Sequence, residues 1–169
     1  MPKASGYIRF VGKGYGAVAF AETIEYPRRN ICFIEMNPAN QVYLASWVDG
    51  TYYKPPKMWK MERNVVYPFT LEYKPGGIVM ARVGGVELTP LPAPKVERPF
   101  KTFGDVEYYP NWWDVPEYRN TAIGAGAGAA IGAIAGYFIK PLGPVVSEAV
   151  LALIGGLGGG AAGYLTAKP

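Results

Sequence analysis

The first 91 residues alternate apolar and polar side chains with a period of about two, and this pattern restricts the fold more than any other feature of the chain. A period of two places successive side chains on opposite faces of an extended strand. Strands are predicted at 6–11, 16–24, 30–36, 41–48, 51–54, 64–73, 77–83 and 86–91. We therefore expect residues 1–91 to form an all-β domain, a small antiparallel sandwich or jelly roll, with an open barrel as the alternative.

Three turn sequences connect these predicted strands. Asp49-Gly50 and Gly84-Gly85 each supply residues that tolerate the positive φ angles of a two-residue hairpin turn. The segment 74–77, Lys-Pro-Gly-Gly, is typical of a longer turn. The turns predict that the strands on either side of each are antiparallel neighbours.

A change of composition follows the β-domain. Prolines at every second or third position up to Pro99 remove backbone donors, so this part can neither enter a sheet interior nor form a helix. Tryptophan and tyrosine then become frequent up to Tyr118. We interpret residues 92–120 as a stiff linker followed by an aromatic segment.

Glycines recur at a spacing of four in two apolar segments of the last part, residues 121–169. On a helix this spacing produces a stripe without side chains, along which two helix backbones can approach closely. Both uncharged segments, 121–139 and 149–167, would span roughly 28 Å, close to a hydrocarbon core of about 30 Å. The glycines are Gly124, Gly128, Gly132 and Gly136 in the first segment and Gly155, Gly159 and Gly163 in the second.

This C-terminal third resembles the glycine-zipper two-helix membrane hairpin proteins. The resemblance implies a transmembrane hairpin whose helices pack through these glycines, with the lipid bilayer as a partner. Aromatic side chains near the ends of the spans are then expected at the membrane interface; they are Trp112, Trp113, Tyr118, Tyr137 and Tyr164. Helices buried in a protein assembly and a low-complexity tail are the alternatives.

Residues 52–63 interleave basic and aromatic side chains, a combination that binds phosphates while stacking on bases, sugars or lipid headgroups. The candidate partner-binding residues are Tyr53, Lys54, Lys57, Trp59, Lys60 and Arg63. A solvated loop with one ring in the sandwich explains the same pattern. Trp47, in an alternating strand, is expected in the core, whereas Trp59 is expected to be an exposed anchor.

Several classes of function are excluded or disfavoured by composition. The chain has no histidine and one cysteine, Cys32, so a histidine-based triad and a structural zinc cluster are excluded. No spacing of carboxylates predicts a catalytic pair, and we expect no catalytic residue, metal or cofactor.

A net charge of +4 is too small to indicate nucleic acid. The glycine-rich segment 12–16 precedes no helix and is interpreted as a hairpin rather than a phosphate-binding loop. The absence of histidine and the near absence of glutamine are typical of a heat-adapted protein.

These observations favour a non-enzymatic structural protein in a multi-copy, membrane-associated assembly. We expect a virion component between a capsid and an internal membrane, or a cell-envelope component, with both termini on the cytoplasmic or equivalent side. Its partners would be copies of itself and other structural proteins. The alternatives are a membrane-anchored lectin-like or host-surface module that binds a glycan, and an oligomeric pore former. An aromatic platform beside a groove on the sandwich would favour the lectin-like module.

Overall fold

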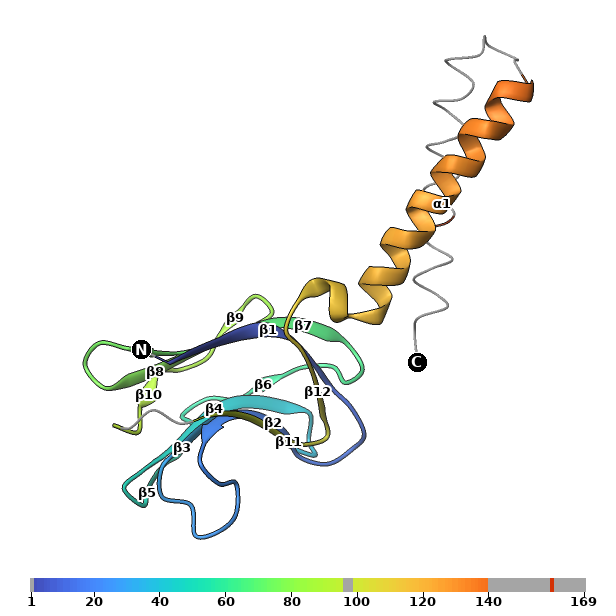
Figure 1. The fold of residues 1–169 in the computed structure, drawn as a ribbon. Coiled ribbons are helices and arrows are strands. Elements are labelled where there is room, and N and C mark those ends of the chain that lie inside the picture. The colour runs from blue at the N-terminus through green and yellow to red at the C-terminus, as the bar shows by residue number, and fades with distance from the viewer. Residues whose placement is uncertain (1, 96–98, 140–158, 160–169) are drawn as a thin grey trace. The chain divides into compact units, whose positions relative to one another are not determined.

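The computed structural model describes residues 2–95, 99–139 and 159. The chain divides into two compact units, Met1–Pro110 and Asn111–Pro169. In its described residues the first unit contains two six-stranded antiparallel sheets, which form the upper and lower layers of a sandwich in Figure 1. We refer to them as sheet A and sheet B.

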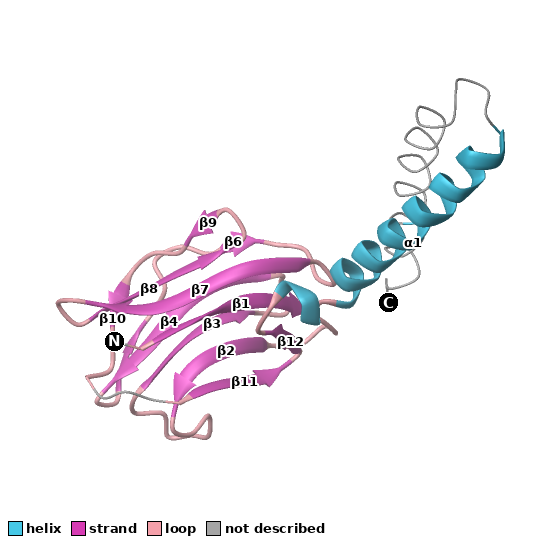
Figure 2. Ribbon diagram, turned by 45° about the horizontal axis from the view of Figure 1, so that its top comes forward, coloured by secondary structure: helices cyan, strands magenta, loops and turns pink. Residues whose placement is uncertain are grey.

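Each sheet combines strands from distant parts of the sequence (Figure 2). The order in sheet A is β10 (Leu91–Pro92), β8 (Ile78–Val83), β7 (Val66–Lys74), β1 (Lys3–Phe10) and β12 (Val106–Tyr109), with β9 (Val86–Glu87) paired to β8. The order in sheet B is β11 (Phe100–Gly104), β2 (Gly16–Ala21), β3 (Ile31–Met36), β4 (Gln41–Val48) and β5 (Thr51–Tyr53), with β6 (Trp59–Lys60) paired to β4.

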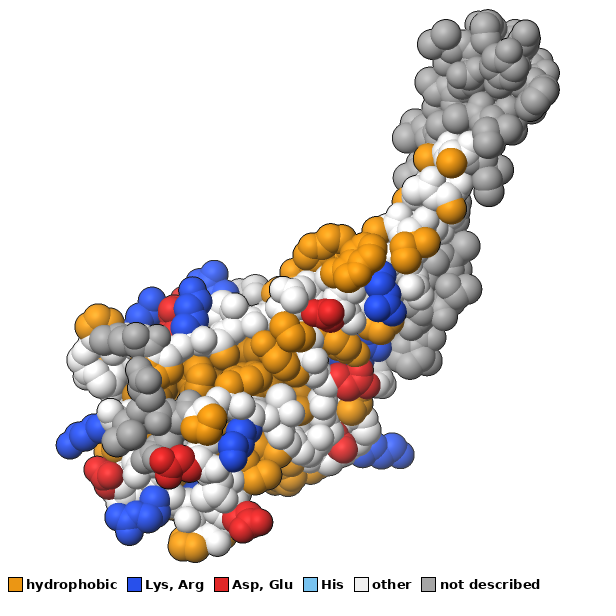
Figure 3. Space-filling view, in the orientation of Figure 1, with side chains coloured by type: hydrophobic (Ala, Val, Ile, Leu, Met, Phe, Trp, Pro, Cys, Tyr) orange, Lys and Arg blue, Asp and Glu red, His pale blue; other side chains and the backbone are white. Residues whose placement is uncertain are grey.

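The main hydrophobic core lies between the two sheets. Alternate residues of each strand point inward, so Phe69 and Leu71 of β7 meet the main core together with Ile34 of β3 and Leu44 of β4. Each large aliphatic or aromatic side chain buried in this way contributes about 1.5–3 kcal/mol. Figure 3 shows hydrophobic side chains in the middle of the sandwich and charged side chains around its margin.

A second hydrophobic cluster covers the opposite face of sheet B. Every residue of β2 and β3 is buried, because the side chains that point away from the main core are also covered. The buried members are Ala17, Ala19, Ala21, Ile31, Phe33, Tyr43 and Ala45, and Ile24, Trp47, Met58 and Phe103 pack against them. Ile24 belongs to the loop between β2 and β3, drawn in blue below the lower layer of Figure 1. Sheet B therefore carries packed side chains on both faces.

The β-sandwich and its hairpin turns confirm the prediction for the N-terminal part. Asp49 and Gly50 have φ angles of 51° and 86° between β4 and β5, and Gly84 has a φ of 60° between β8 and β9. The longer turn between β7 and β8 also contains two residues with positive φ, Gly76 and Gly77. The strand boundaries shift by only a few residues, because the alternation follows the pleat of each strand.

Part of the predicted linker belongs to the sandwich. Strand β11 pairs with β2 at the edge of sheet B, and β12 pairs with β1 at the edge of sheet A. The chain crosses between the sheets at Gly104, which has a φ of 71° and where a Cβ would overlap the carbonyl oxygen of Tyr15. The prolines before residue 100 restrict only the short strand β10 and its loops, since edge strands tolerate proline. The first unit therefore extends to residue 110 rather than 91.

The second unit begins with the short 3-10 helix η1 (Trp112–Asp114) and continues as helix α1 (Pro116–Ile139). In α1 up to residue 130, Gly124, Ala125, Gly128 and Ala129 lie on a half-buried face, whereas Gly126 faces open space. A Cβ at Gly159 would overlap the carbonyl oxygen of Gly124. The side chains beyond residue 130 of α1, and the predicted packing residues Gly155 and Gly163, lie outside the described part, so their packing role stays a prediction.

The predicted transmembrane hairpin is wrong for the part of the chain that the structure describes. No helix within residues 2–95, 99–139 and 159 has both the length and the hydropathy needed to cross a bilayer. Glycine and alanine, which dominate α1, bury little apolar surface per residue and favour transfer into hydrocarbon less than leucine does. The predicted membrane-associated location was inferred from this hairpin, so that prediction is wrong as well. The second predicted span, 149–167, falls outside the described residues except for Gly159.

We expect a fragment of residues 1–110 to fold alone and a fragment of residues 1–91 to fail. The longer fragment keeps β11 and β12, which cover the edges of β2 and β1. The shorter one leaves both edges unpaired and removes Phe100 and Tyr108 from the core. Circular dichroism with thermal melting of both fragments checks this. A cooperative transition in the 1–91 fragment would contradict it.

Candidate functional site

Three aromatic side chains form a surface on the outer face of sheet B, and we call them the aromatic platform. They are Tyr26 from the loop between β2 and β3, Trp47 from β4 and Tyr52 from β5. The ring centroids of Trp47 and Tyr52 are 4.9 Å apart with an interplanar angle of 35°, and those of Tyr26 and Trp47 are 6.5 Å apart at 85°. Tyr26 is 72% exposed and Tyr52 45%. Trp47 and Tyr52 therefore overlap in a tilted stack, and the Tyr26 ring stands at a steep angle to Trp47.

The platform is held by local backbone structure. Trp47 and Tyr52 are direct cross-strand partners because the Asp49-Gly50 turn fixes the register of β4 and β5. The loop that carries Tyr26 is tied to this turn, since the Gly50 N–H donates to the Arg29 carbonyl at 2.9 Å and the Asp49 N–H donates to Asn30 Oδ1 at 2.9 Å. Such anchoring lowers the conformational entropy that a ligand would otherwise have to remove.

Arg28 lies next to the platform against three aromatic rings. Its Cζ is 4.6 Å from the ring centroid of Tyr26, 5.3 Å from that of Phe33 and 5.6 Å from that of Phe103. Its Nε–H donates to the Ile24 carbonyl at 3.3 Å. The planar guanidinium is therefore held in place by contacts with rings and by a bond to its own loop.

Glu35 of β3 brings a carboxyl group to the same face of sheet B. It is only 7% exposed, and its cross-strand partner Tyr43 donates a hydroxyl hydrogen bond to Glu35 Oε1. Burial raises the pKa of Glu35, and the Tyr43 hydrogen bond and the positive charge of Arg28 oppose this only in part. Burial and the nearby Glu35 also raise the pKa of Tyr43.

Electrostatics couple these groups to the platform. Burial raises the pKa of Tyr52, the negative charge of Glu35 raises it further, and the cation of Arg28 opposes both effects. An exposed aromatic surface, a fixed cation and a buried carboxyl group therefore belong to one site. The arrangement can stack against a flat apolar ligand face and hydrogen-bond to polar groups at its rim.

The structure does not assemble the predicted binding segment, residues 53–63, into a comparable surface. Lys54, Lys57 and Lys60 are exposed, but Tyr53 and Trp59 pack against the main core. Trp59 faces inward because it is the cross-strand partner of the buried Val42. The expectation of an exposed Trp59 is therefore wrong. Both tryptophans are half-buried, Trp59 against the main core and Trp47 against the second cluster on the outer face of sheet B.

Arg63 serves the fold. Its Nη1 donates to the Val11 carbonyl at 2.8 Å, and its Nη2 donates to the carbonyls of Gly14 at 2.8 Å and Asn37 at 3.0 Å. Its Nε donates to Asn40 Oδ1 at 2.7 Å. One guanidinium therefore joins the β1–β2 loop and the β3–β4 loop to the segment before β7.

The glycine-rich loop between β1 and β2 already has an anionic partner within the chain. The Asp105 carboxylate accepts the backbone N–H groups of Lys13 at 3.1 Å and Gly14 at 2.7 Å. A bound phosphate would have to displace this carboxylate. The geometry therefore favours the interpretation of residues 12–16 as a structural hairpin.

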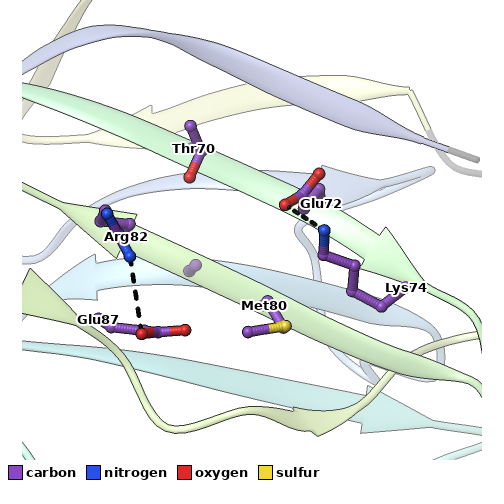
Figure 4. Close-up of a pocket in the computed structure, with 7 residues that line it drawn as sticks. Thr70, Glu72, Lys74, Met80, Arg82 and Glu87 are labelled. Atoms are coloured by element: carbon purple, nitrogen blue, oxygen red, sulfur yellow. Dashed lines mark ion pairs between the residues drawn. The ribbon is translucent and has the colours of Figure 1, made fainter.

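A polar pocket of about 320 Å³ lies on sheet A, and Figure 4 shows its lining side chains. Lys74 pairs with Glu72 at 2.8 Å, and Arg82 pairs with Glu87 at 3.7 Å. The Lys74 hydrogen bond lowers the pKa of Glu72. Charges of opposite sign thus balance within the pocket, which has no aromatic ring in its lining. No group of three or more metal-binding side chains occurs among the described residues.

The aromatic residues predicted at a membrane interface fall into different settings. Trp112 and Trp113 of η1 are 50% and 45% exposed, with ring centroids 5.3 Å apart. Tyr118 is half-buried in α1. The Tyr137 side chain and Tyr164 lie outside the described part of the chain.

The sequence matches no family model and no curated protein. Among solved structures, the chain is similar to a carbohydrate-binding module of Bacillus subtilis (15% identity, TM-score 0.41), a galectin of Caenorhabditis elegans (12%, 0.48) and a β-glucanase of Bacillus licheniformis (9%, 0.48). The alignments cover 63% of this chain in each case and 66%, 77% and 52% of those chains. The chain thus spans about two thirds of the first structure and half of the third. At these values the likeness assigns neither a ligand nor an activity.

Fold and surface together define a two-sheet β-sandwich with an exposed aromatic platform on one sheet. The interpretation as a membrane-associated virion or capsid component is wrong for its membrane part, because no helix among the described residues can cross a membrane, and nothing in the described structure supports the rest. The pore-former alternative also required membrane-spanning hairpins and loses the same support. The expectation that the chain is not an enzyme stays a prediction.

We expect the substitution Arg63→Ala to lower the free energy of unfolding by about 3 kcal/mol or more, because it leaves several carbonyl groups without their charged donor. Lys60→Ala, at an exposed position nearby, is the matched control and should change stability by less than about 0.5 kcal/mol. Urea unfolding of both variants measures the difference. Equal stabilities would show that the Arg63 contacts contribute nothing net.

The raised pKa of Glu35 predicts a pH-dependent contribution to stability. A buried acid whose folded pKa exceeds its unfolded value stabilises the fold most when protonated, and this contribution is lost as pH rises through the folded pKa. Relative to Glu35→Gln, the native chain should therefore become less stable as the pH rises above about 4, where an ordinary glutamate ionises. Urea unfolding across this range checks the trend, with Glu25→Gln in the exposed loop as control. A pH-independent difference between native and Glu35→Gln would argue against the assignment.

Proposed function

We propose that the chain binds a saccharide on the aromatic platform of sheet B. A pyranose ring has an apolar face of C–H groups and a rim of hydroxyl groups, so it pairs with a flat aromatic surface that has polar groups beside it. The observation that carries the proposal is the exposure of Tyr26 and Tyr52, both of which contact the Trp47 ring on the outer side of sheet B.

The rings can contact a sugar both on one face and along one edge. In the tilted stack of Trp47 and Tyr52, Tyr52 is the more exposed ring, and its outer face is available to a ligand. Tyr26, at 85° to Trp47, would border the ligand laterally.

The alternative site at residues 53–63 has weaker support. Its aromatic members, Tyr53 and Trp59, contact the main core, and its arginine is occupied by backbone carbonyls. Lys57 lies with its Nζ 5.0 Å from the Trp59 ring centroid. The remaining exposed groups are lysines without an open ring beside them, which is typical of a solvated loop.

A glycan array with the full chain tests the proposal, followed by calorimetric titration of each saccharide that is retained. Tyr26→Ala and Tyr52→Ala should each weaken binding by about tenfold or more, since loss of an aromatic contact at a binding surface commonly costs over 1 kcal/mol. Both residues are exposed, so the melting temperature should change little.

Trp112→Ala, at a ring of similar exposure in the other unit, is the matched control and should bind like the native chain. The proposal fails if no saccharide is retained, or if both platform variants bind normally. Loss of binding only in Trp59→Ala would move the site to residues 53–63.

A further inference from the structure

Arg28 has binding capacity that the fold does not use. Within the described residues its only hydrogen bond is the one from Nε to the Ile24 carbonyl, and no carboxylate forms an ion pair with it. Its two terminal nitrogens are therefore available to a ligand. Arginine in such a position presents parallel N–H groups that match the two oxygens of a carboxylate.

The surroundings fix the plane of this guanidinium. The rings of Tyr26, Phe33 and Phe103 lie within 5.6 Å of its Cζ, and Phe33 and Phe103 belong to strands rather than to the loop. Contact with rings removes water from the guanidinium and restricts its rotamers, so less entropy is lost when it binds a ligand. An anion at this position would also touch the upright ring of the platform, because Tyr26 contacts both Arg28 and Trp47.

The neighbouring carboxyl group does not occupy Arg28. Glu35 accepts the hydroxyl hydrogen bond of Tyr43 and forms no ion pair with Arg28. The exposed Arg29, next in sequence, is a second cation of the loop, which also carries Glu22 and Glu25. Arg28 is the cation that contacts the platform, through the Tyr26 ring, and no carboxylate forms an ion pair with it within the described residues.

We propose that the saccharide bound by the platform is acidic, a uronate whose carboxylate is held by the terminal nitrogens of Arg28 while its ring stacks on Trp47 and Tyr52. This inference rests on the proposed saccharide site and names its ligand class. The rings and Arg28 then have different roles: the rings supply affinity for any pyranose, and Arg28 supplies the preference for a charged one.

Paired ligands that differ only in the carboxyl group test the preference in the native full chain. Oligomers of galacturonate, glucuronate and mannuronate are each compared with their methyl esters by calorimetric titration at constant ionic strength. We expect at least one acid to bind ten times more tightly than its ester. Sulfated neutral oligosaccharides are included, and binding of these but of no uronate would overturn the carboxylate assignment.

Variants then assign the preference to Arg28. Arg28→Gln should abolish the difference between acid and ester, and Arg28→Lys, which keeps the charge but not the planar pair of donors, should lose most of that difference. Arg29→Gln is the matched control and should keep the preference. If Arg29→Gln abolishes it equally, the effect is general charge attraction and the assignment fails.

The outcomes distinguish this inference from the proposed function. Equal binding of acid and ester in the native chain, or binding of neutral saccharides alone, overturns the acidic preference and leaves the saccharide site intact. Binding of no saccharide overturns both. Because the native chain with paired ligands decides the preference, the test holds even if an Arg28 variant is unstable.

Discussion

The covering of sheet B on both faces is the constraint on which the other features depend. The inner face packs against sheet A, and the outer face is covered by apolar side chains that include Ile24 of the β2–β3 loop. Alanines at three alternate positions of β2 keep the outer layer thin, so the loop can lie close to the sheet. This packing brings Tyr26 and Arg28 next to strand residues far from them in sequence. The site therefore exists because a loop is used as a packing layer.

The β-structure was accessible from the sequence because local rules determine it. The Asp49-Gly50 turn fixes the pairing of Trp47 with Tyr52, and the alternation in β7 and β8 separates inward from outward residues. The C-terminal limit of the sandwich could not be predicted from local sequence patterns. Strands β11 and β12 follow a proline-rich segment, and they become strands through partners about 80 to 100 residues earlier in the chain. Pairing over such distances overrides local composition.

The site was only partly visible in the sequence. Glu35 is the one charged residue in the apolar strand 31–36, which is a signal for a functional or hydrogen-bonded position. The positions of Tyr26 and Arg28 depend on how the β2–β3 loop folds over the sheet. No periodicity in the sequence predicts the conformation of this loop. Residues 53–63 show the opposite error, because a basic and aromatic composition was interpreted as a surface although pairing of Trp59 with Val42 turns its ring inward.

The crossing from β11 to β12 at Gly104 also determines when the sandwich can form. These two strands occupy one edge of each sheet, yet they are the last of the sandwich to leave the ribosome. Until residue 109 has been synthesised, β1 and β2 present unpaired backbone groups on both layers, and such edges can pair with other chains. A nascent chain of this protein therefore exposes these two edges throughout that interval. The same distant pairings give the sandwich a high contact order, which predicts slow folding for a unit of this size.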